Sequence, residues 1–156
     1  MLAEPILHVV LVQPEIPQNT GTTARLCAAA AARLHLVGPL GFSLEDRYLR
    51  RAGLDYWPSV DLEVHADWQS FRVKHPRASL WLFSARAQRS YTDVRYRPAD
   101  FLVFGGETRG LPAALLAEGS DRALRIPMRG TAVRSLNLAN AAAIVAYEAL
   151  RQLGLT

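Results

Sequence analysis

The chain has 156 residues and a mass of 17.2 kDa, with 50% hydrophobic and 21% charged residues. This is the size and composition of one ordinary globular domain, which excludes a disordered tail and a collagen-like fibre. The single cysteine, Cys27, excludes an internal disulfide framework. The apolar run at residues 6–12 is too short to span a bilayer, and no basic segment precedes it as in a signal peptide. We therefore expect a cytoplasmic protein without a membrane segment.

Arginine dominates the positive charge, and the excess lies in the second half of the chain. Seventeen of the 18 basic residues are arginines, and residues 79–156 carry the whole formal net charge of +4. The planar guanidinium group suits phosphate recognition, so this half of the chain is compatible with an RNA or DNA partner. Arginine use also follows genomic composition, and scattered arginines commonly form a solvated surface. Charge alone leaves both interpretations open.

Six short apolar runs predict the strands of a sheet. Most are closed by proline, glycine or polar residues. In chain order they are residues 6–12, 34–37, 62–65, 80–83, 101–104 and 124–126. Helical patterns lie between most of them, an order typical of α/β proteins with a parallel sheet. No repeat, linker or change of composition divides the chain, so we expect one domain over residues 1–156.

Capping residues predict where the helices begin. Asn19 or Thr20 is expected to cap the first helix, Ser43 the second and Asp67 the third. Pro112 is expected to open the fourth helix, because proline is favoured in a first helical turn. The fifth helix is expected to begin near residue 136. The predicted ends lie near residues 32, 53, 74, 116 and 153.

The last predicted helix is apolar on almost every side between Leu138 and Ala146. A helix this apolar is buried on most of its surface. Two interpretations stay open: a central core helix, or a helix that serves both the core and a subunit interface. Its polar residues form one stripe, made up of Asn137, Asn140, Tyr147 and Arg151.

Four loops that follow predicted strands concentrate polar and glycine residues. The carboxyl ends of parallel strands are where α/β proteins bind their ligands. The third loop carries Glu107, Thr108 and Arg109, which a simple turn between a strand and a helix does not require. We therefore expect functional groups at this edge of the sheet. The loops are residues 14–21, 84–86, 105–112 and 127–137.

Several common catalytic signatures are absent from the sequence. It contains no G-x-G-x-x-G dinucleotide loop, no G-K-[ST] phosphate loop and no G-x-S-x-G nucleophile elbow. Cys27 lies among alanines and is expected to be a buried thiol. The histidines show no metal-ligand spacing, so we predict no metal site. They are His8, His35, His65 and His75.

Three segments, taken in order, resemble the three motifs of the SPOUT RNA methyltransferases. The first places Asn19, Gly21 and Arg25 at fixed spacing, and the second is the run F-G-G-E-T-R-G-L-P at residues 104–112. The third joins I-P-M at residues 126–128 to S-L-N-L-A-N-A at residues 135–141. The similarity is strongest to the small branch of one domain that methylates the ribose of the tRNA wobble nucleotide. It extends over about residues 6–154.

The resemblance implies a fold, a cofactor and an assembly. The fold is a Rossmann-like α/β domain with a parallel sheet, whose C-terminal part is tied in a deep trefoil knot. The cofactor is S-adenosylmethionine, and the assembly is a homodimer through the last helix, in which Arg25 serves the partner's site. The implied cofactor contacts are Phe83, Gly105, Ile126 and Ser135. The implied catalytic and substrate residues are Arg25, Asn19, Glu107, Ser135, Asn137 and Tyr147.

The implied reaction moves a methyl group from S-adenosylmethionine to the ribose 2′-hydroxyl of nucleotide 34 in the tRNA anticodon loop. Holding the hydroxyl, the methyl group and the sulfur in line supplies much of the rate. A guanidinium stays protonated, so we expect Arg25 to stabilise the developing alkoxide and hold a neighbouring phosphate. Glu107 is the other candidate for handling the proton. Alternatively, Glu107 pairs with an arginine or orients its loop.

Two other functions stay open at this point. One is the same reaction on another RNA, such as ribosomal RNA. The other is a catalytically silent RNA-binding protein on the same scaffold, although the retained motif residues argue against it. A single-stranded loop is the usual target of sequence-specific RNA recognition, which favours the anticodon. Candidates for phosphate contacts, each with a solvated surface as the equal alternative, are Arg86, Arg89, Arg129 and Arg134.

Overall fold

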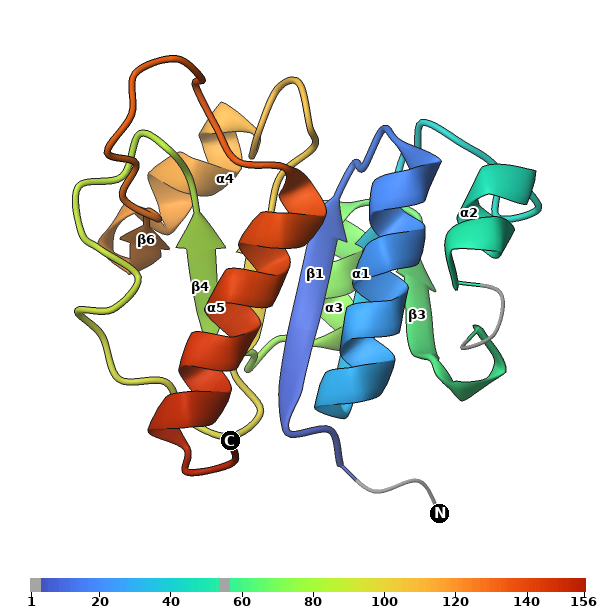
Figure 1. Cartoon of the computed structure of the whole chain (residues 1–156), viewed down its shortest axis with the longest axis horizontal. Helices are drawn as coiled ribbons and strands as arrows, with labels where there is room; N and C mark the ends of the chain where they lie inside the picture. The colour runs from blue at the N-terminus through green and yellow to red at the C-terminus, as the bar shows by residue number, and fades with distance from the viewer. Residues whose placement is uncertain (1–3, 54–56) are drawn as a thin grey trace.

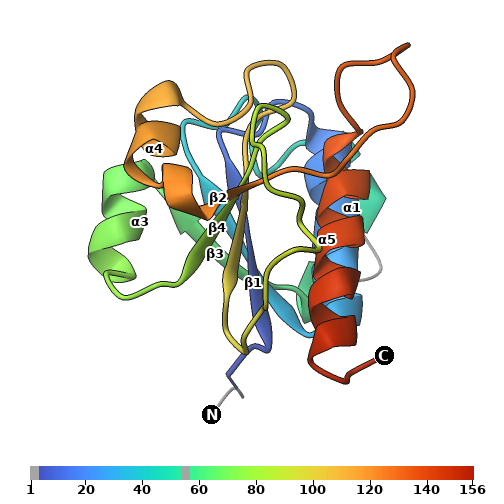
Figure 2. The same ribbon diagram turned by 90° about the vertical axis from the view of Figure 1, so that its left-hand side faces the viewer.

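A computed structural model describes residues 4–53 and 57–156 of the chain. Within these residues, six parallel strands form one sheet in the order β3-β2-β1-β5-β4-β6, with helices on both faces (Figures 1 and 2). The predicted α/β class with a parallel sheet is confirmed. The strands are β1 (Leu7–Val12), β2 (Ala32–Val37), β3 (Asp61–His65), β4 (Leu80–Phe83), β5 (Phe101–Phe104) and β6 (Ala123–Leu124). The helices are α1 (Pro17–Ala30), α2 (Arg47–Gly53), α3 (Trp68–Lys74), α4 (Ala113–Glu118) and α5 (Leu138–Gln152).

β1 lies in the interior of the sheet and is buried along its whole length. It pairs with β2 on one side and with β5 on the other. A strand covered on both faces needs apolar residues at successive positions rather than in alternation. The continuous apolar run that predicted this strand therefore reflects burial on both sides.

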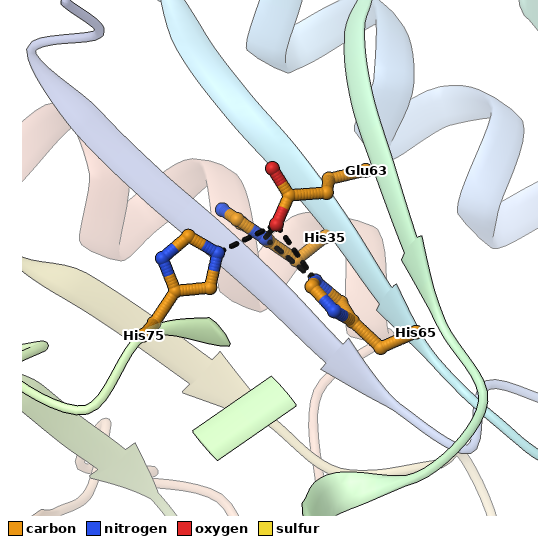
Figure 3. Close-up of side chains that lie close together, drawn as sticks. All are labelled: His35, Glu63, His65 and His75. Atoms are coloured by element: carbon orange, nitrogen blue, oxygen red, sulfur yellow. Dashed lines mark hydrogen bonds and ion pairs between the residues drawn. The ribbon is translucent and has the colours of Figure 1, made fainter. Parts of the chain in front are cut away.

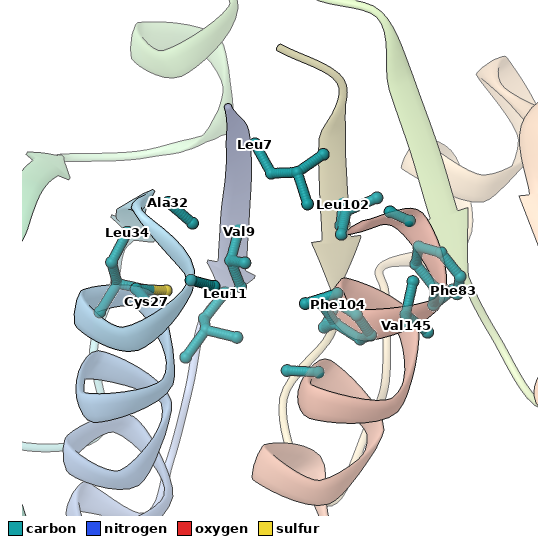
Figure 4. Packing of buried hydrophobic residues seen from close by; sticks show 14 of the residues in the cluster. Leu7, Val9, Leu11, Cys27, Ala32, Leu34, Phe83, Leu102, Phe104 and Val145 are labelled. Atoms are coloured by element: carbon teal, nitrogen blue, oxygen red, sulfur yellow. The ribbon is translucent and has the colours of Figure 1, made fainter. Parts of the chain in front are cut away.

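The two faces of the sheet bury separate apolar clusters. Figure 4 shows the cluster on one face, where Cys27 of α1 lies near Leu11 and Val145 of α5 lies near Phe83 and Phe104. On the opposite face, Phe71 of α3 and Leu115 of α4 belong to the second cluster. The prediction of a buried thiol is confirmed, since Cys27 is fully buried and burial raises the pKa of its thiol.

Helix α1 begins earlier than predicted. Its first residue is Pro17 and its N-cap is Ile16, so the prediction of Asn19 or Thr20 as the cap is wrong. Pro17 starts the helix readily, because the missing proline N–H belongs to the first turn, where backbone N–H groups have no partner within the helix. The apolar side chain of Ile16 cannot accept a hydrogen bond, so no side chain caps the helix. The segment just before the helix is instead held by a residue distant in the chain, described below.

Helix α2 begins later than predicted. Ser43 does not cap it; its hydroxyl accepts a hydrogen bond from the backbone N–H of Glu45 within a short turn. Asp46 takes the capping role, because its carboxylate accepts hydrogen bonds from the N–H groups of Tyr48 and Leu49. A carboxylate also suits the positive end of the helix dipole. The helix then runs from Arg47 to Gly53, where the sequence predicts its end.

The remaining boundaries follow the sequence more closely. Asp67 caps α3 as predicted, accepting from the backbone N–H of Ser70 at 2.8 Å. Pro112 is the residue just before α4. Helix α5 begins at Leu138, two residues later than predicted, because the side chain of Asn137 caps it through the N–H of Asn140.

The last strand is shorter than predicted. β6 pairs only with β4, and its final pair joins Leu124 to Phe83, the last residue of β4. Beyond this point no β4 residue remains to extend the ladder, so Ile126 lies outside the strand. Arg125 instead forms an isolated bridge with Ser90 in the segment after β4. The deep knot that the resemblance implies remains a prediction.

Helix α5 buries one side and exposes the other. Its buried residues face α1 and the sheet. Ile144 and Tyr147 lie on the outer side, with exposed fractions of 38% and 46%. One copy of the chain therefore covers only part of this apolar helix. No helix in the described residues is long and apolar enough to cross a membrane.

Candidate active site

The carboxyl ends of β1 and β5 lie next to each other and bring two predicted loops together. Because the strands are parallel and paired, residues 13–16 after β1 and residues 105–111 after β5 leave the sheet at the same edge (Figure 1). The residue pair Leu11 and Phe104 marks the end of this ladder. The expectation of functional groups at this edge is therefore matched by the position of the loops.

Glu107 joins the two loops through its carboxylate. Its Oε1 atom accepts a hydrogen bond from the backbone N–H of Glu15 at 2.8 Å. Its Oε2 atom accepts from the backbone N–H of Ile16, also at 2.8 Å. These N–H groups belong to the N-cap residue Ile16 and to the residue before it, so Glu107 fixes the path of the chain into α1 and places a negative charge near the positive end of the helix dipole.

Two asparagines extend this contact to the last helix. The Asn19 side chain donates to Glu107 Oε2 at 3.2 Å and accepts from the amide of Asn137 at 3.0 Å. Asn137 also caps α5. We call Glu107, Asn19 and Asn137 the polar network. It brings together one residue from each of the three motifs of the resemblance.

A second connection between the same loops is not evident from the sequence. The carboxylate of Glu15 accepts from the Thr108 hydroxyl at 2.6 Å and from the Thr108 backbone N–H at 3.3 Å. Glu15 and Glu107 thus each reach into the loop of the other. Only the position of Glu15 in the loop that follows the first predicted strand could have indicated it.

Close backbone packing explains the glycines of the loop after β5. A Cβ atom on Gly105 would overlap backbone atoms of Gly110 and Leu111. The loop turns back on itself here, with the N–H of Gly110 donating to the carbonyl of Gly106 at 2.9 Å. Gly110 has a φ of 68°, in the left-handed region that favours glycine. The tight turn presents Glu107 to the start of α1.

The predicted cofactor loops also converge. The rings of Phe83 and Phe104 stack with centroids 4.7 Å apart, and the N–H of Ser84 donates to the carbonyl of Leu124 at 2.9 Å. The chain therefore leaves β4, β5 and β6 at neighbouring points. Ile126 packs, partly buried, against the core, and Gly105 is also partly buried. Apolar side chains beside backbone polar groups are the features that an adenosine group requires, so these residues fit S-adenosylmethionine.

The other predicted site residues lie on exposed positions. Arg25 is exposed on α1, Tyr147 is exposed on α5 and Ser135 is exposed in the segment before α5. In the described part of the chain, no hydrogen bond of the polar network reaches Ser135 or Tyr147. The structure therefore unites three of the six predicted catalytic residues directly.

The four arginines proposed for phosphate contacts are all exposed. Two of them, Arg86 and Arg89, line a groove of about 610 Å³ between the segment that follows β4 and the residues that lead into β6. Arg89 is held there by a hydrogen bond of 3.1 Å to the carbonyl of Asp121. The other two are Arg129 and Arg134, in the segment between β6 and α5.

A cluster of histidines, which the sequence did not predict, lies on another part of the sheet. His8, His35 and His65 lie on β1, β2 and β3, which are neighbours in the sheet but distant in the chain. His75 follows α3 and reaches the same place. The spacing of the histidines along the chain does not indicate that they meet, because the order of the strands in the sheet brings them together.

Comparison with known proteins identifies the class of this site. The model of the SpoU rRNA Methylase family matches residues 6–147. The chain therefore belongs to this family of enzymes that methylate RNA.

Individual relatives point to a narrower group. A tRNA (cytidine(34)-2′-O)-methyltransferase of Saccharophagus degradans is 47% identical over 150 residues, which cover 96% of this chain and 97% of that protein. A structure described as giving insight into 2′-OH methylation of C/U34 on tRNA superposes with a TM-score of 0.91 at 52% identity, covering 95% of this chain and 96% of the other. An AdoMet-bound rRNA methyltransferase from Sinorhizobium meliloti has a TM-score of 0.80 at 27% identity, covering 97% of this chain and 58% of the other.

Replacing Gly105 by alanine should destabilise the loop that carries Glu107. The added methyl group would overlap backbone atoms, which cannot move aside as a flexible side chain can. We expect the free energy of unfolding to fall by about 2 kcal/mol or more in urea unfolding. Gly130→Ala is the matched control, since a Cβ there meets nothing within 4 Å. It should change stability by less than about 0.5 kcal/mol. Equal stability of the two variants would contradict the packing argument.

Proposed function

We propose that this protein transfers a methyl group from S-adenosylmethionine to the ribose 2′-hydroxyl of nucleotide 34 in the tRNA anticodon. The polar network carries the proposal, because it joins the three motif segments at the edge of the sheet where the cofactor loops leave it. The close relatives named above act on cytidine 34 or on C/U34 of tRNA. A tRNA substrate also implies a cytoplasmic location.

The residues that would hold the cofactor lie at the ends of β4, β5 and β6. Phe83 and Ile126 supply apolar surface, while Gly105 supplies backbone groups in a turn without a side chain. Ser135 lies in the exposed segment before α5 and would close over the site from there. When bound, S-adenosylmethionine supplies an electrophilic methyl group. The chain's own task is to hold the ribose hydroxyl in line with that group.

Glu107 serves as a positioning residue in this proposal. Its two oxygens accept three hydrogen bonds from Glu15, Ile16 and Asn19. A carboxylate engaged in this way holds the start of α1 and the amide of Asn19 in place. Of the three roles that the sequence leaves open for Glu107, the geometry supports orientation of the loop.

Arg25 is the residue that we propose for charge stabilisation. It lies on α1, the helix whose start is held by Glu107, and its side chain is exposed at the surface. A guanidinium cannot accept the hydroxyl proton at neutral pH. It can stabilise the negative charge that develops on the 2′-oxygen and pair with a phosphate of the RNA backbone.

The exposed side of α5 supports a dimeric site. Ile144 and, within the polar stripe, the aromatic ring of Tyr147 expose apolar surface on α5, the helix that packs beside α1. A second copy would cover this surface with its own α5. Because α1 packs beside α5, the Arg25 side chain of that copy would then lie toward the cofactor loops of its partner. The proposed enzyme is therefore a homodimer whose site takes residues from both copies.

Methyl transfer to tRNA tests the proposal directly. Labelled S-adenosylmethionine is incubated with the protein and total tRNA from cells, and the modified nucleosides are mapped by mass spectrometry. We expect one 2′-O-methylated nucleoside at position 34. Label in ribosomal RNA but not in tRNA would favour the same chemistry on another substrate. RNA binding without any transfer would favour the silent RNA-binding function.

Arg25→Ala should abolish methyl transfer while the cofactor still binds. Loss of a group that stabilises developing charge lowers the rate of the chemical step by about 100-fold or more. Single-turnover kinetics and calorimetric titration with S-adenosylmethionine measure the two effects separately. Arg77→Ala is the control, because Arg77 is an exposed arginine beside the opposite end of β4. A normal single-turnover rate in Arg25→Ala would remove this residue from the mechanism.

Ile144→Arg should convert the dimer into a monomer. The substitution places a charge in the apolar surface that the second copy would cover, which is costly to bury. Sedimentation velocity at micromolar concentration measures the change. Val73→Arg is the control, since Val73 is an apolar residue with 81% exposure on α3, on the other face of the sheet. A wild-type protein that sediments as a monomer would contradict the dimeric site.

A further inference from the structure

Three histidines and a glutamate converge on the face of the sheet that α3 covers. His35, Glu63, His65 and His75 each direct one ligand atom toward a common point, and these four atoms lie within 4.8 Å of one another (Figure 3). We call these four residues the histidine cluster. It lies on the opposite face from α1 and α5, away from the polar network.

The register of the sheet explains why these residues meet. His35 of β2 pairs with Glu63 of β3, and Val37 of β2 pairs with His65. Residues two apart in a strand point to the same face, so Glu63 and His65 share the face of His35. His75 reaches the cluster from the end of α3, which is held over this face by the buried ring of Phe71. The backbone therefore fixes each member before any ligand binds.

Four of the six distances between the ligand atoms of the histidine cluster lie between 2.5 and 3.7 Å, and none exceeds 4.8 Å. Glu63 Oε1 lies 3.2 Å from Nε2 of His65, 3.7 Å from Nδ1 of His35 and 2.5 Å from Nε2 of His75. Nδ1 of His35 lies 3.1 Å from Nε2 of His65. Four ligands at the bond lengths of zinc form a tetrahedron with edges of about 3.3 Å. Small side-chain movements would bring these atoms to that geometry.

A fifth residue, His8, forms a hydrogen bond to one of the proposed ligands, His35. Nδ1 of His8 and Nε2 of His35 share a hydrogen bond of 2.8 Å, while Nδ1 of His35 faces the cluster. With Nδ1 of His35 as a metal ligand, its Nε2 carries the ring proton and donates it to His8. The ring of His8 stacks on Phe101 with centroids 3.8 Å apart. Metal-binding histidines commonly place their second ring nitrogen in such a hydrogen bond, which fixes the tautomer and the ring orientation. His8 supplies this second contact for His35.

Two cations stand near the glutamate and must be accounted for. Nζ of Lys74 lies 3.4 Å from Glu63 Oε1, but its side chain is 60% exposed and is free to turn toward solvent. Arg33 lies 3.8 Å from the other oxygen of Glu63 and is held mainly by Asp61 at 2.9 Å. The metal would compete with Lys74 for Oε1 and leave the contacts of Arg33 in place.

We infer that the histidine cluster is a structural site for one divalent transition metal of the zinc type. Imidazole nitrogens with one carboxylate oxygen suit zinc, whereas magnesium prefers oxygen ligands alone. The ligands come from β2, β3 and the end of α3, so the metal would join the sheet to the helix that covers it. On binding, the protons in the hydrogen bonds of His75 Nε2 with Glu63 and of His35 Nδ1 with His65 Nε2 leave the ligand nitrogens, and each moves to the other nitrogen of the same neutral ring.

Metal binding to the purified, untagged protein tests the inference. After treatment with a chelator, the protein is titrated with Zn²⁺, and bound metal is measured by mass spectrometry. We expect one equivalent per chain and a rise in melting temperature of several degrees, with no effect of Mg²⁺. Co²⁺ in place of Zn²⁺ should give the intense visible spectrum of tetrahedral coordination without a thiolate charge-transfer band. A weak octahedral spectrum, a thiolate band or the absence of stoichiometric binding would overturn the inference.

Substitutions of two ligands then locate the metal. Glu63→Gln and His75→Asn should each weaken Zn²⁺ binding by more than about 100-fold, since loss of an outer hydrogen bond alone costs 10- to 100-fold. Asp61→Asn is the matched control, because Asp61 is a carboxylate on the same strand and face that pairs with Arg33. Zn²⁺ binding to both ligand variants with wild-type affinity would overturn the assignment. The cobalt spectrum of the unaltered protein decides the geometry even where a variant does not fold.

Lys74→Gln provides a variant with the opposite expected effect. Removing the ammonium that shares Glu63 Oε1 takes away a competitor for the metal. We expect Zn²⁺ to bind several-fold more tightly, measured by the same titration. An affinity that falls would contradict the assignment of Glu63 Oε1 as a ligand.

Discussion

The contact of one carboxylate with the start of one helix holds the proposed active site together. Helix α1 begins at a proline after an isoleucine and has no local side chain to accept its first N–H groups. Glu107, some ninety residues away in the chain, accepts two N–H groups at this start. A single hydrogen bond of this kind contributes about 1 kcal/mol to stability. Here it also fixes the distance between the loop after β5, helix α1 and, through Asn19, helix α5.

The elements predicted from the sequence are those whose causes are local. A buried parallel strand needs a continuous apolar run, and β1 has one. Asp67 caps α3 through a residue three positions away. The start of α1 was mispredicted because no side chain caps it, and the segment before it is held by Glu107 from a distant loop. Asp46 rather than Ser43 caps α2, since two suitable caps stand close together and only the packed structure selects one.

The candidate site shows the same division. The motif resemblance indicated Asn19, Glu107 and Asn137, and the structure joins their side chains. It could not indicate the reciprocal contact of Glu15 with Thr108, which depends on how two loops cross. The histidine cluster was also missed, because strand order and register rather than spacing create it. The two faces of the sheet therefore differ in what covers them. One face is covered by α1 and α5, the helices of the proposed dimer, and the other holds the histidine cluster.

The bond between Asn19 and Asn137 also bears on the time at which the protein acquires its activity. These residues are 118 positions apart, and the second lies directly before the last helix. During synthesis, β1, α1 and β2 can pair and pack as soon as they emerge, since their contacts are close in sequence. The polar network must wait until Asn137 has left the ribosome, after every strand of the described sheet. A nascent chain, or one cut before Asn137, can thus have a largely formed sheet and still lack a site, so activity reports that the segment leading into α5 has been made and has folded.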